Sequence, residues 1–193
     1  MKILAVETCL GACSAALVDG NGKREICWEP MERGHAEALA PMVQQVMRGH
    51  DFASLDRLAV STGPGTFTGQ RVGLSFMRGL RLALNKPLLG VTSLEAMAAE
   101  ASDAHCGEPR IAAIHDARRD EAYLALFENG VTILSPRVLP FSAAVEAIRA
   151  FGPCLLTGTG QGAALEKLGK GFLSTMIEQP SAFFVATLAA EMP

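Results

Sequence analysis

The sequence of 193 residues predicts an α/β protein of two lobes, each built on a mixed β-sheet. Three observations carry this prediction. Each half opens with three short strand-like segments, and in each half helical and strand-like segments then alternate. Between the halves, residues 103–109 form a polar, turn-rich stretch. The expected lobes are therefore residues 1–102 and residues 103–193.

The first half is expected to hold five strands and three helices. Its opening strands are predicted at about residues 2–7, 13–18 and 23–29. The turn Asp19-Gly20-Asn21-Gly22 joins the second and third of them. The later elements are a helix at 34–48, a strand at 56–61, a helix at 68–84, a strand at 88–91, and a helix that Thr92 or Ser93 caps.

The second half repeats this order. Its three opening strands are predicted at residues 111–115, 121–127 and 131–139. The elements expected after them are a helix at 141–151, a strand at 154–157, and helices at 161–168 and 181–191. No residue-level repeat between the halves accompanies this shared order.

The composition indicates a globular protein, because hydrophobic residues make up 49% and charged residues 19% of the chain. The formal charge of −3 argues against a chain that grips nucleic acid by itself. The five cysteines include no Cys-x-x-Cys pair, which predicts reduced thiols in a cytoplasmic protein. No apolar run reaches the roughly 20 residues of a membrane helix, so no membrane span is expected.

The stretch "STGPGTFTGQRVGL" at residues 61–74 has the strand, glycine turn and helix order of a phosphate-binding loop. A P-loop, however, has lysine after its last glycine, and Gln70 follows Gly69 here. Pro64 also removes one backbone donor. Gly69 and Gly73 lie on one face of the predicted helix. They predict the close approach of another backbone, either the chain's own first helix or a helix of a partner.

Other catalytic patterns are missing from the sequence. The four histidines form neither His-x-x-x-His nor His-Glu-x-x-His, and no Gly-x-Ser-x-Gly motif occurs. His115, followed by Asp116 and an arginine, is expected to shape a hairpin, and a functional site is the alternative. The turns at Glu7-Thr8 and Gly158-Thr159-Gly160 remain as places where a ligand could bind.

Six ordered segments resemble the TsaB (YeaZ) family. They are "ILAVETCLGACSAALVDG", "ERGHAEALAPMVQQVM", "STGPGTFTGQRVGLSFMRGLRLAL", "PLLGVTSLEAMA", "IHDARRDEAYLALF" and "LLTGTGQGA". Together they span about residues 1–163. The resemblance implies a two-lobed actin-like ATPase (ribonuclease H-like) fold. It also implies a non-catalytic subunit that binds the transferase TsaD and works with the ATPase TsaE. These proteins form threonylcarbamoyl-adenosine next to the anticodon of tRNA.

The resemblance also bears on metal and cofactor binding. The metal-binding histidine pair of TsaD-like proteins falls on Ser93 and Met97, whose side chains are poor substitutes for two imidazoles. No metal and no cofactor are therefore expected. ATP or ADP in the interlobe cleft, or at the partner interface, is the alternative. Its candidate residues in the cleft are Glu7, Thr8, Gly158 and Gly160, because the first turn faces the nucleotide phosphates in this fold.

The resemblance places the TsaD interface on the two helices around residues 34–48 and 68–84. The residues expected there are His35, Leu39, Met42, Val43, Val46, Gly69, Arg71, Val72, Gly73, Phe76, Met77 and Leu80. Without a partner the same face is expected to form a homodimer, and tRNA is contacted through the complex. The alternative functions are a nucleotide-dependent enzyme, such as a small kinase or ATPase, and more remotely a glycoprotease-type peptidase.

Overall fold

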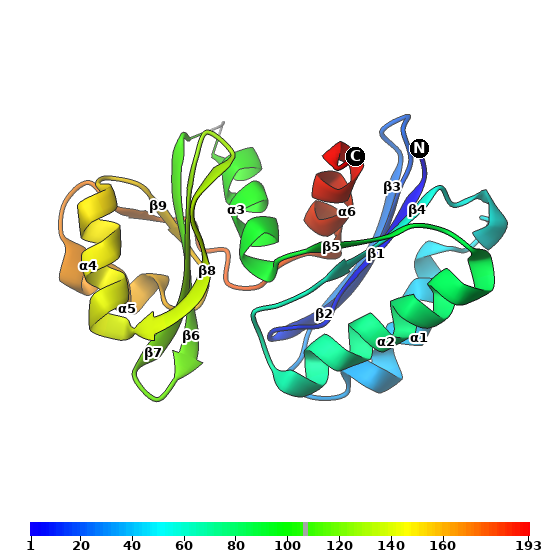
Figure 1. Cartoon of the computed structure of the whole chain (residues 1–193), viewed down its shortest axis with the longest axis horizontal. Coiled ribbons are helices and arrows are strands. Elements are labelled where there is room, and N and C mark those ends of the chain that lie inside the picture. Colours follow the sequence, from blue (N-terminus) through cyan, green and yellow to red (C-terminus); the bar gives the residue numbers. More distant parts are fainter. Residues whose placement is uncertain (106–107) are drawn as a thin grey trace. The chain divides into compact units, whose positions relative to one another are not determined.

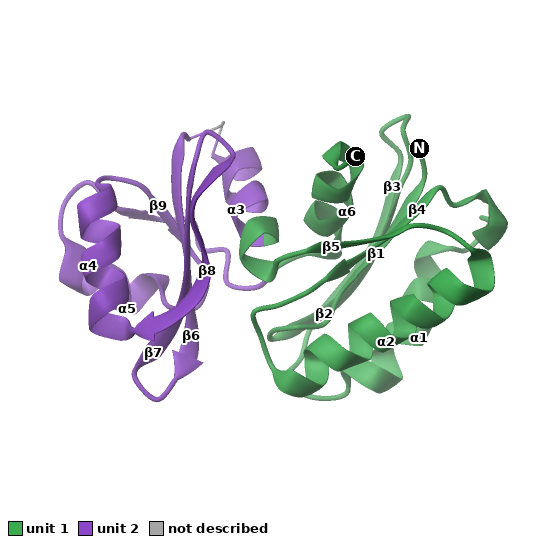
Figure 2. Cartoon of the chain, in the orientation of Figure 1, with its two compact units in different colours: residues 1–96, 180–193 green, residues 97–179 purple. Residues whose placement is uncertain are grey.

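The computed structural model describes residues 1–105 and 108–193 and divides the chain into two compact units (Figures 1 and 2). Unit 1 comprises residues 1–96 and 180–193, and unit 2 comprises residues 97–179. Cys106 lies outside the described residues. The expected α/β class with two lobes and mixed sheets is confirmed, since each sheet contains parallel and antiparallel pairs.

The sheet of unit 1 has the strand order β3-β2-β1-β4-β5. The first three strands pair antiparallel, and β4 and β5 continue the sheet in parallel from β1. The strands are β1 (Ile3–Glu7), β2 (Ala12–Val18), β3 (Arg24–Pro30), β4 (Arg57–Ser61) and β5 (Leu88–Val91). Central strands β1 and β4 are apolar except for Glu7, Arg57 and Ser61, and almost all of their residues are buried, as expected of strands that are covered on both faces.

Alternate residues of β1 belong to two separate hydrophobic cores in unit 1. Leu4 and Val6 pack with helices α1 (His35–Val46) and α2 (Phe67–Leu84). Ile3 and Ala5 pack with α6 (Ala182–Glu191) on the opposite face (Figure 1). The two-residue period of the strand thus places one helical layer on each side of the sheet. A short 3-10 helix, η1 (Phe52–Ser54), precedes β4.

The sheet of unit 2 has the order β10-β9-β6-β7-β8, which repeats the topology of unit 1. Helices α4 (Phe141–Phe151) and α5 (Gln161–Leu168) supply residues to its core. The strands are β6 (Arg110–Arg118), β7 (Glu121–Glu128), β8 (Val131–Pro140), β9 (Leu155–Thr157) and β10 (Leu173–Ser174). The sequence did not predict the two-residue strand β10.

The expected lobe boundary between residues 102 and 103 is wrong in two respects. The division falls inside α3 (Ser93–Ala104), between Ala96 and Met97. In addition, the last helix was assigned to the second lobe, but α6 packs on the sheet of unit 1. The physical reason is the apolar surface of α6, which fits the face of the β1–β2–β4 sheet that α1 and α2 leave uncovered.

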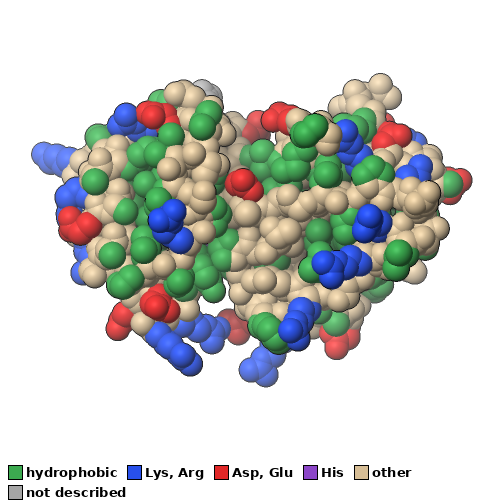
Figure 3. Space-filling model, viewed as in Figure 1, with side chains coloured by type: hydrophobic (Ala, Val, Ile, Leu, Met, Phe, Trp, Pro, Cys, Tyr) green, Lys and Arg blue, Asp and Glu red, His purple; other side chains and the backbone are tan. Residues whose placement is uncertain are grey.

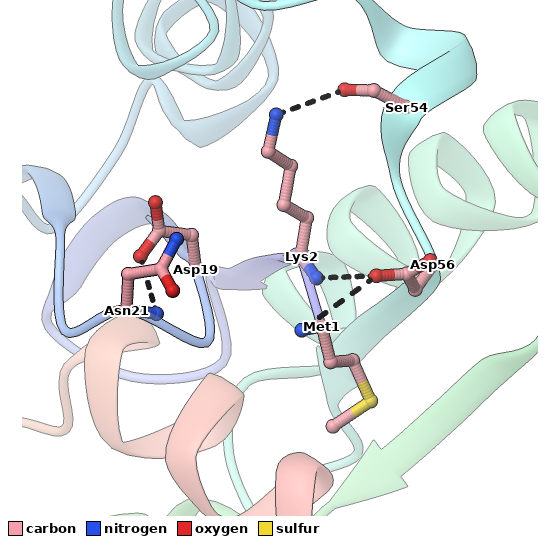
Figure 4. A network of polar contacts seen from close by, with 6 residues as sticks. All are labelled: Met1, Lys2, Asp19, Asn21, Ser54 and Asp56. Carbon is pink, nitrogen blue, oxygen red and sulfur yellow. Dashed lines mark hydrogen bonds and ion pairs between the residues drawn. The ribbon is translucent and has the colours of Figure 1, made fainter.

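A polar network ties the start of β1 to the residues before β4 (Figure 4). The backbone N–H of Lys2 donates to Asp56 Oδ2 at 2.6 Å, and the N–H of Asp56 donates to the carbonyl of Lys2 at 2.9 Å. The amino group of Met1 lies 4.0 Å from the same carboxylate. Nearby, the carboxylate of Asp19 accepts a hydrogen bond from the backbone of Asn21 in the β2–β3 turn. The contacts of Asp56 with Met1 and Lys2 support the register of the two parallel strands, β1 and β4.

Arg57 at the start of β4 anchors the C-terminal end of α6. Its Nη1 donates to the carbonyls of Ala189, at 3.2 Å, and Met192, at 2.5 Å. The last carbonyls of a helix have no partner within the helix, so a guanidinium satisfies groups that would otherwise need water.

Replacing Arg57 with Ala is expected to lower the free energy of unfolding by about 1–2 kcal/mol, because two charge-assisted hydrogen bonds are lost. Urea denaturation followed by circular dichroism measures this. Arg48→Ala serves as the control, since Arg48 is exposed. Equal stability of the two variants would contradict the anchoring role.

Candidate functional site

The glycine-rich loop packs directly against the turn between β1 and β2. The backbone N–H of Thr66 donates to the carbonyl of Cys9 at 2.7 Å. A Cβ atom placed on Gly65 would lie 2.2 Å from the Cys9 carbonyl oxygen, and one placed on Gly69 would lie 2.1 Å from the Thr8 carbonyl oxygen. No real Cβ atom tolerates such distances. The loop needs glycine here so that two carbonyl groups can approach it.

The side chain of Thr8 completes this contact. Its buried hydroxyl donates to the carbonyl of Gly69 at 2.7 Å and accepts from the N–H of Gly73 at 3.1 Å. A Cβ on Gly73 would lie 2.6 Å from this oxygen. The expectation that Gly69 and Gly73 accommodate a neighbouring helix is therefore wrong. Their neighbour is the chain's own β1–β2 turn, which lies far away in sequence.

Glu7 lies at the base of this turn and is fully buried. Its carboxylate accepts hydrogen bonds from the backbone N–H of Cys9 and, at 3.2 Å, from the hydroxyl of Ser93. The hydroxyls of Ser93 and Ser61 lie 2.7 Å apart. Burial raises the pKa of Glu7, although these hydrogen bonds oppose the shift. No salt bridge of the described residues includes Glu7.

The two positions where the resemblance places metal-binding histidines are both buried. The hydroxyl of Ser93 is engaged with Glu7, and Met97 supplies a thioether inside the core. A neutral hydroxyl and a soft thioether do not fit a hard or borderline cation. Within residues 1–105 and 108–193, no three His, Cys, Asp or Glu side chains are grouped so that they could hold a metal ion. The expectation of no metal stays a prediction.

Most of the residues expected at a partner interface face the interior of unit 1. Eight of the twelve are buried: His35, Leu39, Met42, Val43, Val46, Gly69, Gly73 and Met77. The apolar side chains belong to the core beneath α1 and α2. Nε2 of His35 lies 3.1 Å from the carbonyl of Leu10, so His35 also secures the β1–β2 turn. The apolar residues of α1 that the resemblance assigned to the interface form the stripe that α1 buries against its own sheet.

The outer side of α2 carries the exposed residues. Phe67 is 69% exposed and Leu82 is 82% exposed. The guanidinium of Arg71 lies 3.6 Å from the centre of the Phe67 ring, so the pair forms a cation–π contact. Val72, Phe76 and Leu80, which the sequence also suggested, pack partly on the core. Sequence reasoning missed Phe67 and Leu82. The row of Gly69, Gly73 and Met77 at i, i+4 spacing could have revealed them. This row marks the buried face of α2, and Phe67 and Leu82 lie on the face opposite to it.

The second candidate turn, in unit 2, also owes its glycines to packing. A Cβ on Gly158 would lie 2.3 Å from the carbonyl oxygen of Ile114, and the N–H of Gly160 donates to that oxygen at 3.1 Å. His115 is buried, and its Nδ1 lies 3.5 Å from the N–H of Thr159. Burial lowers the pKa of His115 to about 4, against the opposing effect of Asp116.

The turn at Glu7 and Thr8 does not fit a nucleotide phosphate or its metal ion. The carboxylate of Glu7 is buried and bonded within the chain, and the Thr8 hydroxyl is used by the α2 backbone. A carboxyl that orients a metal or a water has to be ionised and reachable. Glu7 and Thr8 therefore give no support to ATP or ADP binding, and binding at Gly158 and Gly160 stays a prediction.

The surface of the chain carries mixed charge. On the face shown in Figure 3, acidic and basic side chains are interspersed over both units. This pattern is consistent with the formal charge of −3 and differs from the basic surface of a protein that binds nucleic acid alone. In the part of the chain that the structure describes, no helix has the length and apolar character needed to cross a membrane.

Comparison with solved structures defines the class of the fold. The ethanolamine utilization protein EutJ of Carboxydothermus hydrogenoformans superimposes with a TM-score of 0.55 at 13% identity, covering 97% of this chain and 90% of that one. YeaZ from Pseudomonas aeruginosa gives a TM-score of 0.84 at 32% identity, covering 98% and 90%. With the repeated 3-2-1-4-5 strand order, these similarities define a protein of the actin-like ATPase fold.

Sequence comparisons identify the family. A family model described as "TsaD: tRNA N6-adenosine threonylcarbamoyltransferase" matches residues 26–187. The tRNA threonylcarbamoyladenosine biosynthesis protein TsaB of Haemophilus influenzae is 30% identical over 98% of this chain and 85% of its own length. The protein of that name from Escherichia coli is 39% identical over 68% of this chain, but the match spans only 58% of that relative. The chain belongs to the TsaB (YeaZ) family, as its six sequence segments suggested.

Replacing Gly69 with Ala is expected to lower the free energy of unfolding by about 1–3 kcal/mol or more, because the new methyl group meets a backbone carbonyl. Gly79→Ala is the matched control in the same helix, since nothing lies within 4 Å of its Cβ position. The free energy of unfolding of the Gly79→Ala variant should rise by about 0.5–1 kcal/mol, because alanine has a higher helix propensity than glycine. Thermal or urea denaturation distinguishes them, and a neutral Gly69→Ala would refute the close approach.

Replacing Glu7 with Gln is expected to change the pH dependence of stability. Burial raises the folded-state pKa of Glu7 above its ordinary value of about 4.5. The folded state therefore binds the proton of Glu7 more tightly than the unfolded state does. The contribution of this proton to the free energy of unfolding is full below about pH 4.5 and is lost as the pH rises through the raised pKa. Glutamine mimics the protonated carboxyl, so the variant should lose this component of the decline.

Urea denaturation at several pH values between about 4.5 and 9 measures the difference between Glu7→Gln and the wild type. Glu166→Gln provides the control, because Glu166 is exposed on α5. Parallel pH profiles of Glu7→Gln and the wild type would contradict the assignment.

Proposed function

We propose that this chain is a non-catalytic subunit required for threonylcarbamoyl-adenosine formation in tRNA. It binds and supports a transferase of the TsaD type in the cytoplasm, together with an ATPase of the TsaE type. Membership of the TsaB family supports the pathway, since curated members carry the name tRNA threonylcarbamoyladenosine biosynthesis protein. The transfer of the threonylcarbamoyl group itself is assigned to the partner.

The observation that carries the non-catalytic role is the use of Ser93. The resemblance places the first metal-binding histidine of the transferase at this position. Here its hydroxyl is buried and hydrogen-bonded to Glu7 and Ser61, which are buried as well. The position that would hold a metal in the catalytic relative thus belongs to the packing of unit 1. A neutral hydroxyl that is engaged in this way does not fit a catalytic cation, so the Lewis-acid role is assigned to the partner.

The state of the β1–β2 turn also supports this role. Every polar group of Glu7 and Thr8 with a described hydrogen bond is bonded within unit 1. The turn therefore holds α2 in position. A non-catalytic subunit needs such a rigid, fixed helix if it is to bind a partner through that helix.

The docking surface proposed for the partner is the outer side of α2. Phe67, Arg71 and Leu82 are exposed there, whereas Val72, Phe76 and Leu80 pack partly on the core of unit 1. Aromatic and arginine residues contribute strongly to protein interfaces when a partner removes them from water. The same surface is proposed to form a homodimer when the partner is absent, because one apolar patch on two copies is self-complementary.

Reconstitution tests the function. The purified chain is combined with the TsaD-type transferase, the TsaE-type ATPase, tRNA, and the synthase that makes the threonylcarbamoyl-adenylate. Modified nucleoside is measured by mass spectrometry. The full mixture should be active, and omission of either this chain or the transferase should abolish or greatly reduce the product. Robust modification without the transferase would show that the chain is itself the catalyst.

Leu82→Glu tests the docking surface in the same system. A charge in a desolvated apolar contact should weaken binding to the transferase by roughly tenfold or more. Isothermal titration calorimetry measures the affinity, and circular dichroism checks the fold. Val131→Glu is the control, since Val131 is 62% exposed on β8 of unit 2. Unchanged affinity of a folded Leu82→Glu variant would place the interface elsewhere.

A further inference from the structure

Two hairpin turns of unit 2 contain residues with positive φ, but the residue types at these positions differ. The β7–β8 turn has Asn129 at φ 51° and Gly130 at φ 76°. These two residue types tolerate positive φ best. The β6–β7 turn, at the opposite end of β7 (Figure 1), has three consecutive non-glycine residues in this region. They are Arg118 at 67°, Arg119 at 55° and Asp120 at 59°.

The backbone of the β6–β7 turn is fixed by its surroundings. The carboxylate of Asp116 accepts from the N–H of Arg118 at 2.7 Å, and the N–H of Asp116 donates to the Thr159 hydroxyl at 3.0 Å. The carbonyl of Asp120 accepts from the N–H of Phe141, the first residue of α4, at 2.7 Å. Unit 2 therefore specifies the path of the turn, but none of these contacts involves a guanidinium group.

Arg118 and Arg119 are both exposed. None of the salt bridges between described residues includes either of them. Glycine or asparagine would adopt the same backbone at a lower conformational cost, and the β7–β8 turn contains these two residues. Two large side chains stand at unfavourable backbone positions, and no described hydrogen bond or ion pair uses their guanidinium groups. This combination indicates a role outside the chain.

The charges around the turn favour a protein over a polyanion. Asp120 and Glu121 directly follow the two arginines, and both are exposed. Their carboxylates repel the phosphates of a nucleic acid. A protein surface can instead place its carboxylates against the arginines and its basic side chains against the acidic residues. Guanidinium groups bind carboxylates in a bidentate manner, which adds directionality.

We propose that the β6–β7 hairpin tip, residues 116–121, is a protein-docking element whose Arg118 and Arg119 bind carboxylates of a partner. It is a second surface, in unit 2, in addition to the outer side of α2 in unit 1. The inference rests on the proposed function for its partner. The occupant is the TsaD-type transferase, which is tested both alone and with the TsaE-type ATPase bound to it.

The test uses the double variant Arg118→Gly, Arg119→Gly in the full chain. Its melting temperature should equal or exceed that of the wild type, because glycine relieves the strain. Its affinity for the transferase, or for the transferase with the ATPase, should fall roughly tenfold or more, since charge-assisted contacts are lost. Asn129→Gly is the matched control, a glycine at a positive φ that should leave both affinities unchanged. A third arm measures tRNA binding at low and high salt.

The outcomes separate the hypotheses. Wild-type binding that the folded double variant retains would overturn the hairpin proposal alone. A loss confined to the tRNA arm would overturn it in favour of a nucleic-acid contact. A wild-type chain that binds neither protein would overturn the proposed function together with this inference. If the glycine pair fails to fold, the pair Arg118→Asn, Arg119→Asn replaces it, because asparagine also tolerates positive φ.

Discussion

The close approach of two backbone carbonyls to the glycine-rich loop is the constraint on which unit 1 depends. The carbonyl oxygens of Thr8 and Cys9 occupy the space that side chains on Gly69 and Gly65 would need. The first turn of α2 therefore rests on the β1–β2 turn, and Thr8 binds the helix backbone at two points. The position of α2 relative to the sheet follows from this contact, and so does the surface that α2 presents to solvent.

A cluster of buried polar side chains at the base of the β1–β2 turn also stabilises this turn. Glu7, Ser61 and Ser93 come from β1, β4 and the start of α3, and all three are buried. A buried carboxyl without a cation is costly, so its hydrogen bonds to Cys9 and Ser93 are structurally necessary. Here the polar groups are used to hold the turn, which agrees with the proposed supporting role.

Much of the fold could be predicted from the sequence. The strand and helix order was confirmed because the apolar period and the turn residues are local signals. The sequence alone distinguishes the glycine loop from the P-loop motif, because Gln70 stands where that motif has lysine and Pro64 removes a backbone donor. The sequence indicated either Thr92 or Ser93 as the N-cap residue of α3. In the structure Thr92 and Glu95 form a reciprocal capping box, with hydrogen bonds of 2.8 and 3.2 Å.

The sequence by itself therefore determined the class of fold, the family and the positions of the elements, because each depends on local patterns or ordered motifs. Only the tertiary structure decided what the glycines of "STGPGTFTGQRVGL" face, which unit α6 joins, and which side of α2 is exposed. These are contacts between segments far apart in the chain. Apolar residues at helical spacing mark a face that avoids water, but the sequence does not say whether the chain's own sheet or a partner covers that face.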